Sequence, residues 1–560
     1  MTRTSRHLAL AAILTVAAAT RLLDLGNTPP GIHHDEASNG YDAYSILKTG
    51  QDRWGESRPV LLEAFGREDY RAALYAYLII PFHALLGPEQ LILATRLPAA
   101  LIGLLTIASL YALVARTHNA AAALWAALFL TLSPWHLQLS RFGHESSLTP
   151  AFTIFALTLM AYARWPFQRD NDHTKLRTLP LAIAGALFAL SLYSYPSMRV
   201  FTPAFLVAAA VIYRRPILNS VRPGRNRTAV TTALAMACVF ATPIVMLTIT
   251  SWEKTMARAQ QVSLFHQKGL VEALIQTASQ YAAHFSPEWL FIDGDSYPVQ
   301  SPPGLGQLNL VLAPFLIAGI FTAARYCRQN RTNTLLLAWL LLYPIAAAPT
   351  DAAPHALRSA CGLPVFQWLA AIGCHAILSS IASSSRRAAI ATICTLAVTA
   401  NGAFAIRDYF FGWARDPWVA ALYQKDLCDA MRVVRPIRHN YDRIYVSNQY
   451  SAERRWYSGE AYIIVLLALP IEPEDFHAWS KSIIYERPTD GFHRVESFGP
   501  FIMTTRTDVL ERSFKARPHQ RSLFIARPGE QHGRLIDTVT DENGTPRFEI
   551  IDLCPHPHAQ

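Results

Sequence analysis

Long apolar segments recur along the chain and are separated by shorter polar ones. The apolar residues are concentrated in segments of about 17–25 residues, the length that a helix needs to cross about 30 Å of hydrocarbon. This pattern predicts a mainly α-helical, polytopic membrane protein, with a transmembrane domain over residues 1–406. About eleven spans are expected, at residues 8–23, 91–115, 120–135, 148–163, 179–195, 200–213, 229–250, 308–324, 334–348, 362–379 and 388–406.

The basic residues set the predicted orientation, because Lys and Arg in short loops are retained on the cytoplasmic side. If Arg3 and Arg6 are inside, the alternate loops that must also be inside hold nearly every basic cluster between the spans. These clusters are Arg116; Arg164, Arg169, Lys175 and Arg177; Arg214, Arg215, Arg222, Arg225 and Arg227; Arg325, Arg328 and Arg331; and Arg386 and Arg387. We therefore expect a cytoplasmic N-terminus, in the plasma (inner) membrane, and an extracytoplasmic tail over 407–560.

The first apolar segment also resembles a secretory signal peptide, with a basic start and an Ala-rich end at 17–19. We favour an uncleaved first span. Asp35 is expected outside whether this segment is cleaved as a signal peptide or kept as the first span.

Composition agrees with a membrane protein. The 560 residues are 51% hydrophobic and only 16% charged, which is too apolar for one ordinary soluble domain of this length. A net charge of +10 suits a nucleic-acid partner only when the basic residues form one face of a soluble domain. Here the basic residues of the predicted cytoplasmic loops explain most of the excess positive charge. We therefore expect no nucleic-acid partner. The seven cysteines form neither a CxxC metal site nor a disulfide framework.

Four predicted outer segments are rich in polar and aromatic residues. The first, 24–90, contains an interfacial helix at 36–47 and a second apolar stretch, RAALYAYLIIPFHALLG, which is too short for a confident span and is also expected to lie at the interface. The others are SPWHLQLSRFGHESSLTP, residues 251–306 and PTDAAPHALRSACGLP.

The tail over 407–560 predicts a small α/β domain. It contains a helical pattern at 419–434, a short strand at 443–446 and an apparent hairpin, GRLIDTVTDENGTPRFEII, that turns at Asn543 and Gly544. The tail either recognises the acceptor or only stabilises the loops.

The strongest local signal for chemistry is His33-His34-Asp35-Glu36, just after the first span. Two carboxylates flanked by imidazoles provide a general base and a possible metal ligand within one short stretch. In an alternative interpretation, Asp35 caps the following helix and Glu36 is favourable in its first turn. The two interpretations are compatible.

Cations lie near the predicted outer ends of several spans. Arg141 precedes Glu145 in the second outer segment, where the arginine suits a phosphate and the glutamate a substrate or a metal. Arg199, Arg258 and Arg358 occupy similar places, where ordinary snorkelling also puts basic residues. Together they supply positive charge on the face where a lipid phosphate would lie.

The order of these motifs resembles the GT-C membrane glycosyltransferases. It is similar to the branch that contains the protein O-mannosyltransferases and the bacterial enzyme that adds aminoarabinose to lipid A. The resemblance covers about the first 400 residues, and the whole series is far more specific than any one piece. The pieces are PGIHHDE, RLPAALIGLLTIASLYAL, SPWHLQLSRFGHE, SLYSYPSMRVFTP, HFSPEWLFIDGD and PHALR.

The resemblance implies a polyprenyl-phosphate sugar donor, transfer with inversion and membrane lipids around the site. Asp35 matches the family's catalytic aspartate, with Glu36 as its partner. Arg141 and Glu145 fall in the second active loop. Further candidate substrate residues in the loops are His34, Glu68, Tyr195 and His355.

One family feature is altered. Relatives often carry a Glu-Lys-Pro or Glu-Pro motif, where this chain has Arg-Glu-Asp-Tyr-Arg at 67–71, and Glu68 is the nearest equivalent. Some relatives hold a metal between such a glutamate and a histidine of the third loop, which makes Glu68, His266 and His284 the candidates here. A divalent metal ion therefore stays an open possibility.

The main alternative to an enzyme is a transporter or a flippase of a lipid-linked glycan. Such proteins usually place polar or broken helices near the middle of the membrane, whereas this chain has its ionisable groups at the rim of apolar spans. A receptor without catalytic activity is a third interpretation. No motif identifies the sugar, or chooses among a protein, a lipid and a glycan acceptor.

Overall fold

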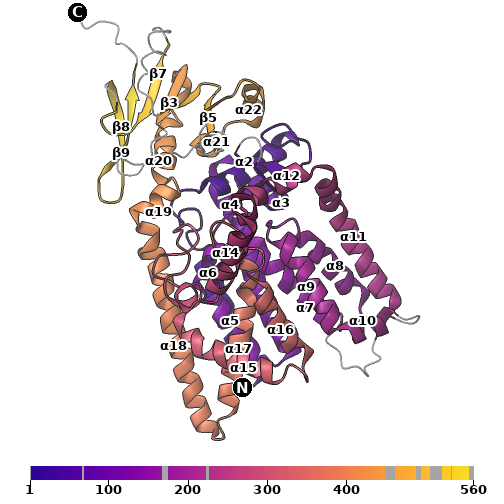
Figure 1. Cartoon of the computed structure of the whole chain (residues 1–560). Helices are drawn as coiled ribbons and strands as arrows, with labels where there is room; N and C mark the ends of the chain where they lie inside the picture. Colours follow the sequence, from indigo (N-terminus) through magenta and orange to yellow (C-terminus); the bar gives the residue numbers. More distant parts are fainter. Residues whose placement is uncertain are drawn as a thin grey trace, which may run out of the picture. The chain divides into compact units, whose positions relative to one another are not determined.

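The computed structural model describes residues 2–65, 69–166, 175–221, 226–447, 461–486, 494–504, 520–530 and 533–553. The chain forms two compact units. The first combines Met1–Leu23 with Pro98–Phe410, and the second combines Asp24–Leu97 with Phe411–Gln560. Helices make up most of the cartoon, and the labelled strands all have the orange to yellow colours of the C-terminal part (Figure 1).

Helices joined by turns and loops make up the first unit, whose described residues contain no β-strand. Two long helices, α4 (Leu91–Thr117) and α18 (Ser384–Phe411), continue across the boundary between the units. The other helices are α1 (Arg3–Leu22), α5 (Ala120–Thr131), α6 (Pro134–Leu139), α7 (Thr149–Tyr162), α8 (Thr178–Ser191), α9 (Met198–Ile212), α10 (Arg214–Val221), α11 (Arg227–Thr250), α12 (Trp252–Val262), α13 (Leu264–Gln267), α14 (Leu270–Ala283), α15 (Ala313–Arg325), α16 (Arg331–Leu342) and α17 (Leu363–Ser379).

Each of the eleven segments predicted to span the membrane is helical over most of its length. Among the described residues, four helices are long and apolar enough to cross a bilayer: Pro88–Thr117, Arg227–Thr250, Ala360–Ser379 and Ser384–Arg415. A fifth span results if Met198–Ile212 and Arg214–Ser220, which meet at 83°, count as one. The count of eleven therefore stays a prediction, because several of the other apolar helices are too short to qualify by themselves.

The predicted span at 120–135 is interrupted. Its first helix, α5, ends at Thr131, and Ser133 caps a new helix by accepting the His136 N–H at 3.4 Å. Pro134 occupies the first turn of α6, where its missing N–H costs nothing. The sequence Ser-Pro thus ends one helix and begins the next.

The second unit contains α2 (His34–Thr49), α3 (Leu74–Leu86) and a two-stranded sheet of β1 (Leu61–Glu63) and β2 (Tyr70–Ala72). Its C-terminal part contains α19 (Pro417–Leu422), α20 (Lys425–Val434), α21 (Ala461–Ala468) and α22 (Pro473–Ser480). The predicted helix at 419–434 is therefore two helices, which are separated at Gln424 by a left-handed backbone with φ 53°.

A seven-stranded sheet forms the rest of this unit, in the order β4-β5-β6-β3-β7-β9-β8. Its strands are β3 (Arg443–Ser447), β4 (Ile484–Glu486), β5 (Arg494–Phe498), β6 (Phe501–Thr504), β7 (Ser522–Ala526), β8 (Arg534–Thr540) and β9 (Pro546–Asp552). The central strand β3 is parallel to both of its neighbours, β6 and β7. The predicted hairpin is confirmed as β8 and β9, with Gly544 at φ 77° in the turn.

One hydrophobic core joins the first outer segment to the C-terminal tail. Tyr41 and Tyr44 of α2 are buried in the same cluster as α21 and the strands of the large sheet. The Tyr41 hydroxyl also donates to the Ile471 carbonyl at 3.0 Å. Residues 24–97 thus pack with the tail into one unit.

Candidate active site

The start of α2 is held by a capping box. His33 is the N-cap, and its Nδ1 accepts the Asp35 N–H at 3.3 Å, while Glu36 Oε2 accepts the His33 N–H at 3.1 Å. This reciprocal arrangement satisfies two of the backbone donors that a helix start leaves unpaired. The prediction that Asp35 caps the helix is therefore wrong, because an imidazole does so, whereas Glu36 does lie in the first turn.

The Glu36 carboxylate forms a buried ion pair with Arg96 of α4. Arg96 Nε lies 2.9 Å from Oε1 and Nη2 lies 2.9 Å from Oε2, and both side chains are 0% exposed. Such two-point pairing is strong and fixes the geometry of both partners. Sequence reasoning missed Arg96, although a cation within the apolar 91–115 segment is a signal for a carboxylate partner.

Arg96 also fixes the loop that leads into α2. Its guanidinium donates to the carbonyls of Leu25 at 3.2 Å, Pro29 at 2.8 Å and Gly31 at 2.8 Å. One buried cation thus connects this loop and the first turn of α2 to α4. The backbone at His33–Glu36 is positioned from both sides.

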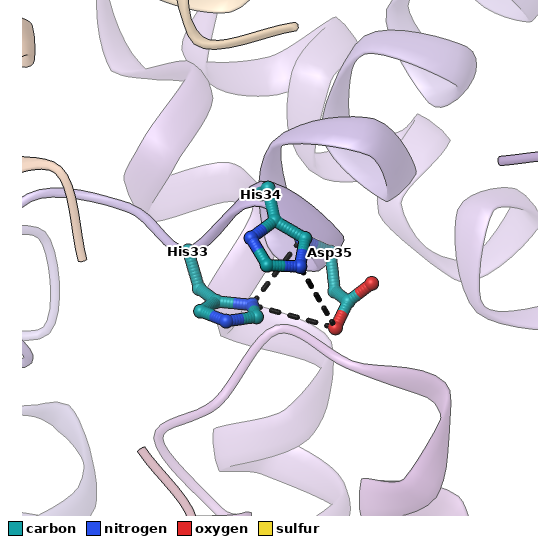
Figure 2. Close-up of side chains that lie close together, drawn as sticks. All are labelled: His33, His34 and Asp35. Atoms are coloured by element: carbon teal, nitrogen blue, oxygen red, sulfur yellow. Dashed lines mark hydrogen bonds and ion pairs between the residues drawn. The ribbon is translucent and has the colours of Figure 1, made fainter. Parts of the chain in front are cut away.

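Asp35 extends from this fixed turn beside two imidazoles (Figure 2). Its Oδ2 lies 3.4 Å from His33 Nδ1 and 3.9 Å from His34 Nε2, and the ring centroids of the two histidines are 3.8 Å apart. The Asp35 side chain is 28% exposed, in contrast to the fully buried Glu36. The Asp35 carboxylate is therefore partly accessible from solvent.

The same three side chains form a candidate metal site. The ligand atoms of His33, His34 and Asp35 lie within 4.8 Å of one another, and this is the one such group found in the described part of the chain. Two imidazole nitrogens and a carboxylate oxygen suit Zn²⁺ and similar divalent ions.

The metal ligands predicted from the sequence are placed differently. Glu68 lies outside the described residues, and His266 is exposed on α13. His284 is buried, with Nδ1 2.8 Å from the Gln280 carbonyl, and burial lowers its pKa to about 4. Neither histidine joins another candidate ligand group in the part of the chain that the structure describes.

A second buried ion network anchors the middle of α2. Asp42 Oδ2 lies 3.0 Å from Arg53 Nη1 and 3.6 Å from Arg71 Nη2. Burial raises the pKa of Asp42, and the two arginines oppose that rise. Arg71 also donates to the Asp35 carbonyl at 3.2 Å, so this network supports the same turn. No local sequence pattern marks these three residues as partners.

In the first unit, the second outer segment is buried. Arg141 is 0% exposed, donates to the Thr20 carbonyl at 2.9 Å and lies 4.8 Å from the centre of the Phe410 ring. Glu145 Oε1 lies 3.5 Å from His144 Nε2, and the ring of Tyr195 is 5.6 Å from that of His144. The structure thus brings the predicted residues Glu145 and Tyr195 to the same histidine.

The other predicted phosphate-binding arginines also contact groups of the first unit. Arg199 donates to the Thr255 carbonyl at 3.1 Å, and Arg258 donates to Gln261 Oε1 at 3.4 Å. Arg358 forms an ion pair with Asp351 at 3.2 Å.

His355 lies where several of these segments meet. Burial lowers its pKa well below the usual range, and the nearby side chains of Arg358, His284, Arg258 and His144 lower it further. Residues from the second, third and fourth outer segments therefore lie near one buried imidazole.

This chain is similar to known proteins in part of its sequence and in its fold. The family model of dolichyl-phosphate-mannose-protein mannosyltransferases matches residues 71–246. The structure is similar to that of ArnT from Cupriavidus metallidurans bound to undecaprenyl phosphate, with 12% identity, 100% of each chain covered and a TM-score of 0.56. A sequence comparison with curated proteins gives no match.

A second solved structure is similar over less of its length. It is the oligosaccharyltransferase of Archaeoglobus fulgidus tethered with an acceptor peptide, with 14% identity and a TM-score of 0.51. The similarity covers 84% of this chain and 63% of that one. At these identities the two likenesses show a shared fold.

Proposed function

We propose, from the GT-C fold and the mannosyltransferase family match of this chain, that it is a membrane glycosyltransferase that uses a polyprenyl-phosphate-linked sugar. The sugar passes to a hydroxyl or a phosphate of an acceptor on the outer face of the membrane, with inversion at the anomeric carbon. The N-terminus is cytoplasmic and the tail is extracytoplasmic, in the plasma membrane.

The observation that carries this proposal is the setting of Asp35. A partly exposed carboxylate projects from a helix turn that the His33 cap and the Glu36–Arg96 ion pair hold in place. Catalytic groups that are fixed before the substrate arrives need little reorganisation during the reaction. Asp35 is therefore the general base, and Glu36 is a positioning residue that acts through the backbone and Arg96.

The reaction is a displacement at the anomeric carbon. Asp35 takes the proton as the acceptor oxygen forms its bond to that carbon, and the bond from the carbon to the lipid phosphate breaks on the opposite face. The electron pair of the broken bond leaves with the polyprenyl phosphate. Positive charge stabilises this leaving group, and its proposed sources are Arg141, Arg199, Arg258 and Arg358. His34, Glu68, Glu145, Tyr195 and His355 complete the proposed set of substrate contacts.

The test is sugar transfer by the full-length protein in nanodiscs, with a panel of radiolabelled polyprenyl-phosphate sugars. Loss of a general base costs about 10²–10⁴-fold in rate, so Asp35→Asn should lower consumption of the donor by at least about a hundredfold. The matched control is Asp537→Asn, which removes the charge of an exposed carboxylate on β8 and should leave the rate unchanged.

Two results would contradict the proposal. Unchanged donor consumption in Asp35→Asn would remove that residue from the catalytic role. Failure of the wild-type protein to consume or bind any donor, together with transbilayer movement of a lipid-linked glycan in liposomes, would favour the flippase interpretation.

A further inference from the structure

A second candidate site lies in the first unit, at the cavity formed by the third and fourth outer segments. Ten residues between 283 and 300, together with residues 351–355, line an open cavity of about 620 Å³. Pockets for small ligands commonly have volumes of about 300–1,000 Å³. His355, one of the proposed substrate contacts, lines this cavity, whereas none of His33, His34, Asp35 and Glu36 does.

The walls of the cavity are connected to one another. Asp295 accepts the Tyr297 N–H at 2.9 Å through Oδ1 and the Ala356 N–H at 2.7 Å through Oδ2, which joins the third outer segment to the fourth. A single turn of π-helix, Glu288–Ile292, forms part of the same wall, and such turns often occur at functional sites. The cavity is therefore a formed feature of the fold.

Two buried polar atoms in the lining have no hydrogen-bond partner within the described residues. They are the Trp289 Nε1 donor and the Gln300 Oε1 acceptor, on side chains of residues that are 4% and 8% exposed. The Gln300 Nε2 atom, by contrast, lies 3.3 Å from His355 Nε2. A buried donor or acceptor without a partner costs about 1–3 kcal/mol, so a ligand that offers both an acceptor and a donor would stabilise this lining.

The charge of the lining selects among possible ligands. Glu288, Asp293 and Asp351 are exposed carboxylates at the cavity, and no lysine or arginine is among the described residues that line it. Asp351 is paired with Arg358, whereas Glu288 and Asp293 form no ion pair with another described residue. Carboxylates accept hydrogen bonds from hydroxyl groups but repel phosphates. The lining therefore suits a hydroxyl-rich ligand better than the phosphate end of a sugar donor.

We propose that this cavity binds an uncharged carbohydrate, as the glycan part of the acceptor. Trp289 and Gln300 supply a donor and an acceptor for its hydroxyl groups, and the carboxylates of Glu288 and Asp293 accept hydrogen bonds from further hydroxyl groups. Its role as an acceptor site rests on the proposed transferase function, whereas the binding of a carbohydrate does not. The acceptor class is then a glycan, among the protein, lipid and glycan acceptors that the sequence left open.

The experiment is calorimetric titration of the full-length protein in nanodiscs with trisaccharides of glucose and of mannose, and with the same sugars carrying a phosphate. We expect saturable binding of at least one uncharged trisaccharide and weaker binding of its phosphorylated form. Trp289→Phe and Gln300→Leu should each weaken binding about two- to tenfold, the loss expected for one hydrogen bond. Asp35→Asn should bind the trisaccharide as the wild type does, even when transfer is lost.

The matched control is Trp339→Phe. Trp339 is also fully buried, but its Nε1 already donates to the Cys361 carbonyl at 2.9 Å, and it does not line the cavity. This variant should leave sugar binding unchanged. Absence of binding by every uncharged trisaccharide, equal binding by the Trp289 and Gln300 variants, or tighter binding of the phosphorylated sugars would overturn the proposal. Absence of transfer by the wild-type protein, with binding of the trisaccharide retained, would count against the proposed function alone.

Discussion

Two adjacent carboxylates at the start of α2 have different environments. Successive residues of an α-helix point about 100° apart, so neighbours can face opposite surroundings. Glu36 points inward to Arg96 and is 0% exposed, whereas Asp35 is 28% exposed beside His33 and His34. The sequence presents them as a pair, but the fold assigns the buried ion pair to Glu36 and leaves Asp35 partly exposed.

We expect the buried Glu36–Arg96 ion pair to stabilise the folded protein. Glu36→Gln leaves the Arg96 guanidinium buried against a neutral amide, and breaking a buried ion pair in this way costs about 3–5 kcal/mol. Thermal unfolding of the purified protein in detergent should show a clear fall in apparent Tm.

The control for this variant is Glu272→Gln, in the exposed Lys268–Glu272 pair of α14. Exposed pairs contribute at most about 1 kcal/mol, so this change should hardly move the Tm. Similar effects of the two substitutions would mean that the Glu36–Arg96 pair does not stabilise the turn.

At the scale of elements, the loop before α2 depends on Gly31. This residue has φ +69°, and a Cβ atom there would lie 2.5 Å from the Tyr423 carbonyl oxygen and 2.6 Å from Lys425 Cα. The loop therefore combines a left-handed backbone with close packing against the segment between α19 and α20. The Gly31 carbonyl also accepts from Arg96, so a shift there would move the turn that carries Asp35.

Gly31→Ala should lower both the Tm and the rate of sugar transfer. The comparison is Gly50→Ala at the end of α2, where φ is +74° but nothing lies within 4 Å of the added Cβ atom. Gly50→Ala should lower the free energy of unfolding by only about 1–2 kcal/mol, the cost of a left-handed backbone at a residue with a Cβ atom, and transfer should be largely retained. If the two variants behave alike in thermal unfolding and transfer assays, packing at Gly31 does not position α2.

At the scale of the whole molecule, the first outer segment and the tail form one folding unit. Tyr41 of α2, Ile464 of α21 and Phe476 of α22 are all buried in one hydrophobic core. A tail that only decorated the membrane part would not share its core with residues 24–97.

Truncation after Phe410 should therefore prevent α2 from folding correctly. Without the tail, α2 loses the apolar surface that buries Tyr41 and Tyr44, and we expect low yields of monodisperse protein and no transfer. A milder change is Phe476→Ala. It removes a buried aromatic side chain and should lower the free energy of unfolding by about 3–5 kcal/mol. Size-exclusion chromatography and thermal unfolding measure the effect of the truncation and of Phe476→Ala. A truncated protein that stays folded would show that the tail is dispensable for the structure.

The sequence alone determined the features that depend on local pattern. The length and periodicity of apolar segments predicted the helices, because each helix satisfies its own backbone and needs no partner to be recognised. The Asn543–Gly544 turn signal predicted the β8–β9 hairpin for the same reason, because turn residues between two strand patterns are a local signal, and the turn itself is Asp541–Thr545 with Gly544 in the left-handed region. The ordered motifs predicted the GT-C resemblance, which the family match and the shared fold confirm.

Tertiary structure decided everything that depends on residues far apart in the chain. Glu36 and Arg96 are 60 positions apart, so no local pattern marks them as a pair. The break at Gln424, the shared core of α2 with the tail, and the cavity between the third and fourth outer segments likewise arise from packing. Local preferences specify which segments become helices and strands, whereas burial decides which polar side chains must find a partner and which can meet a substrate.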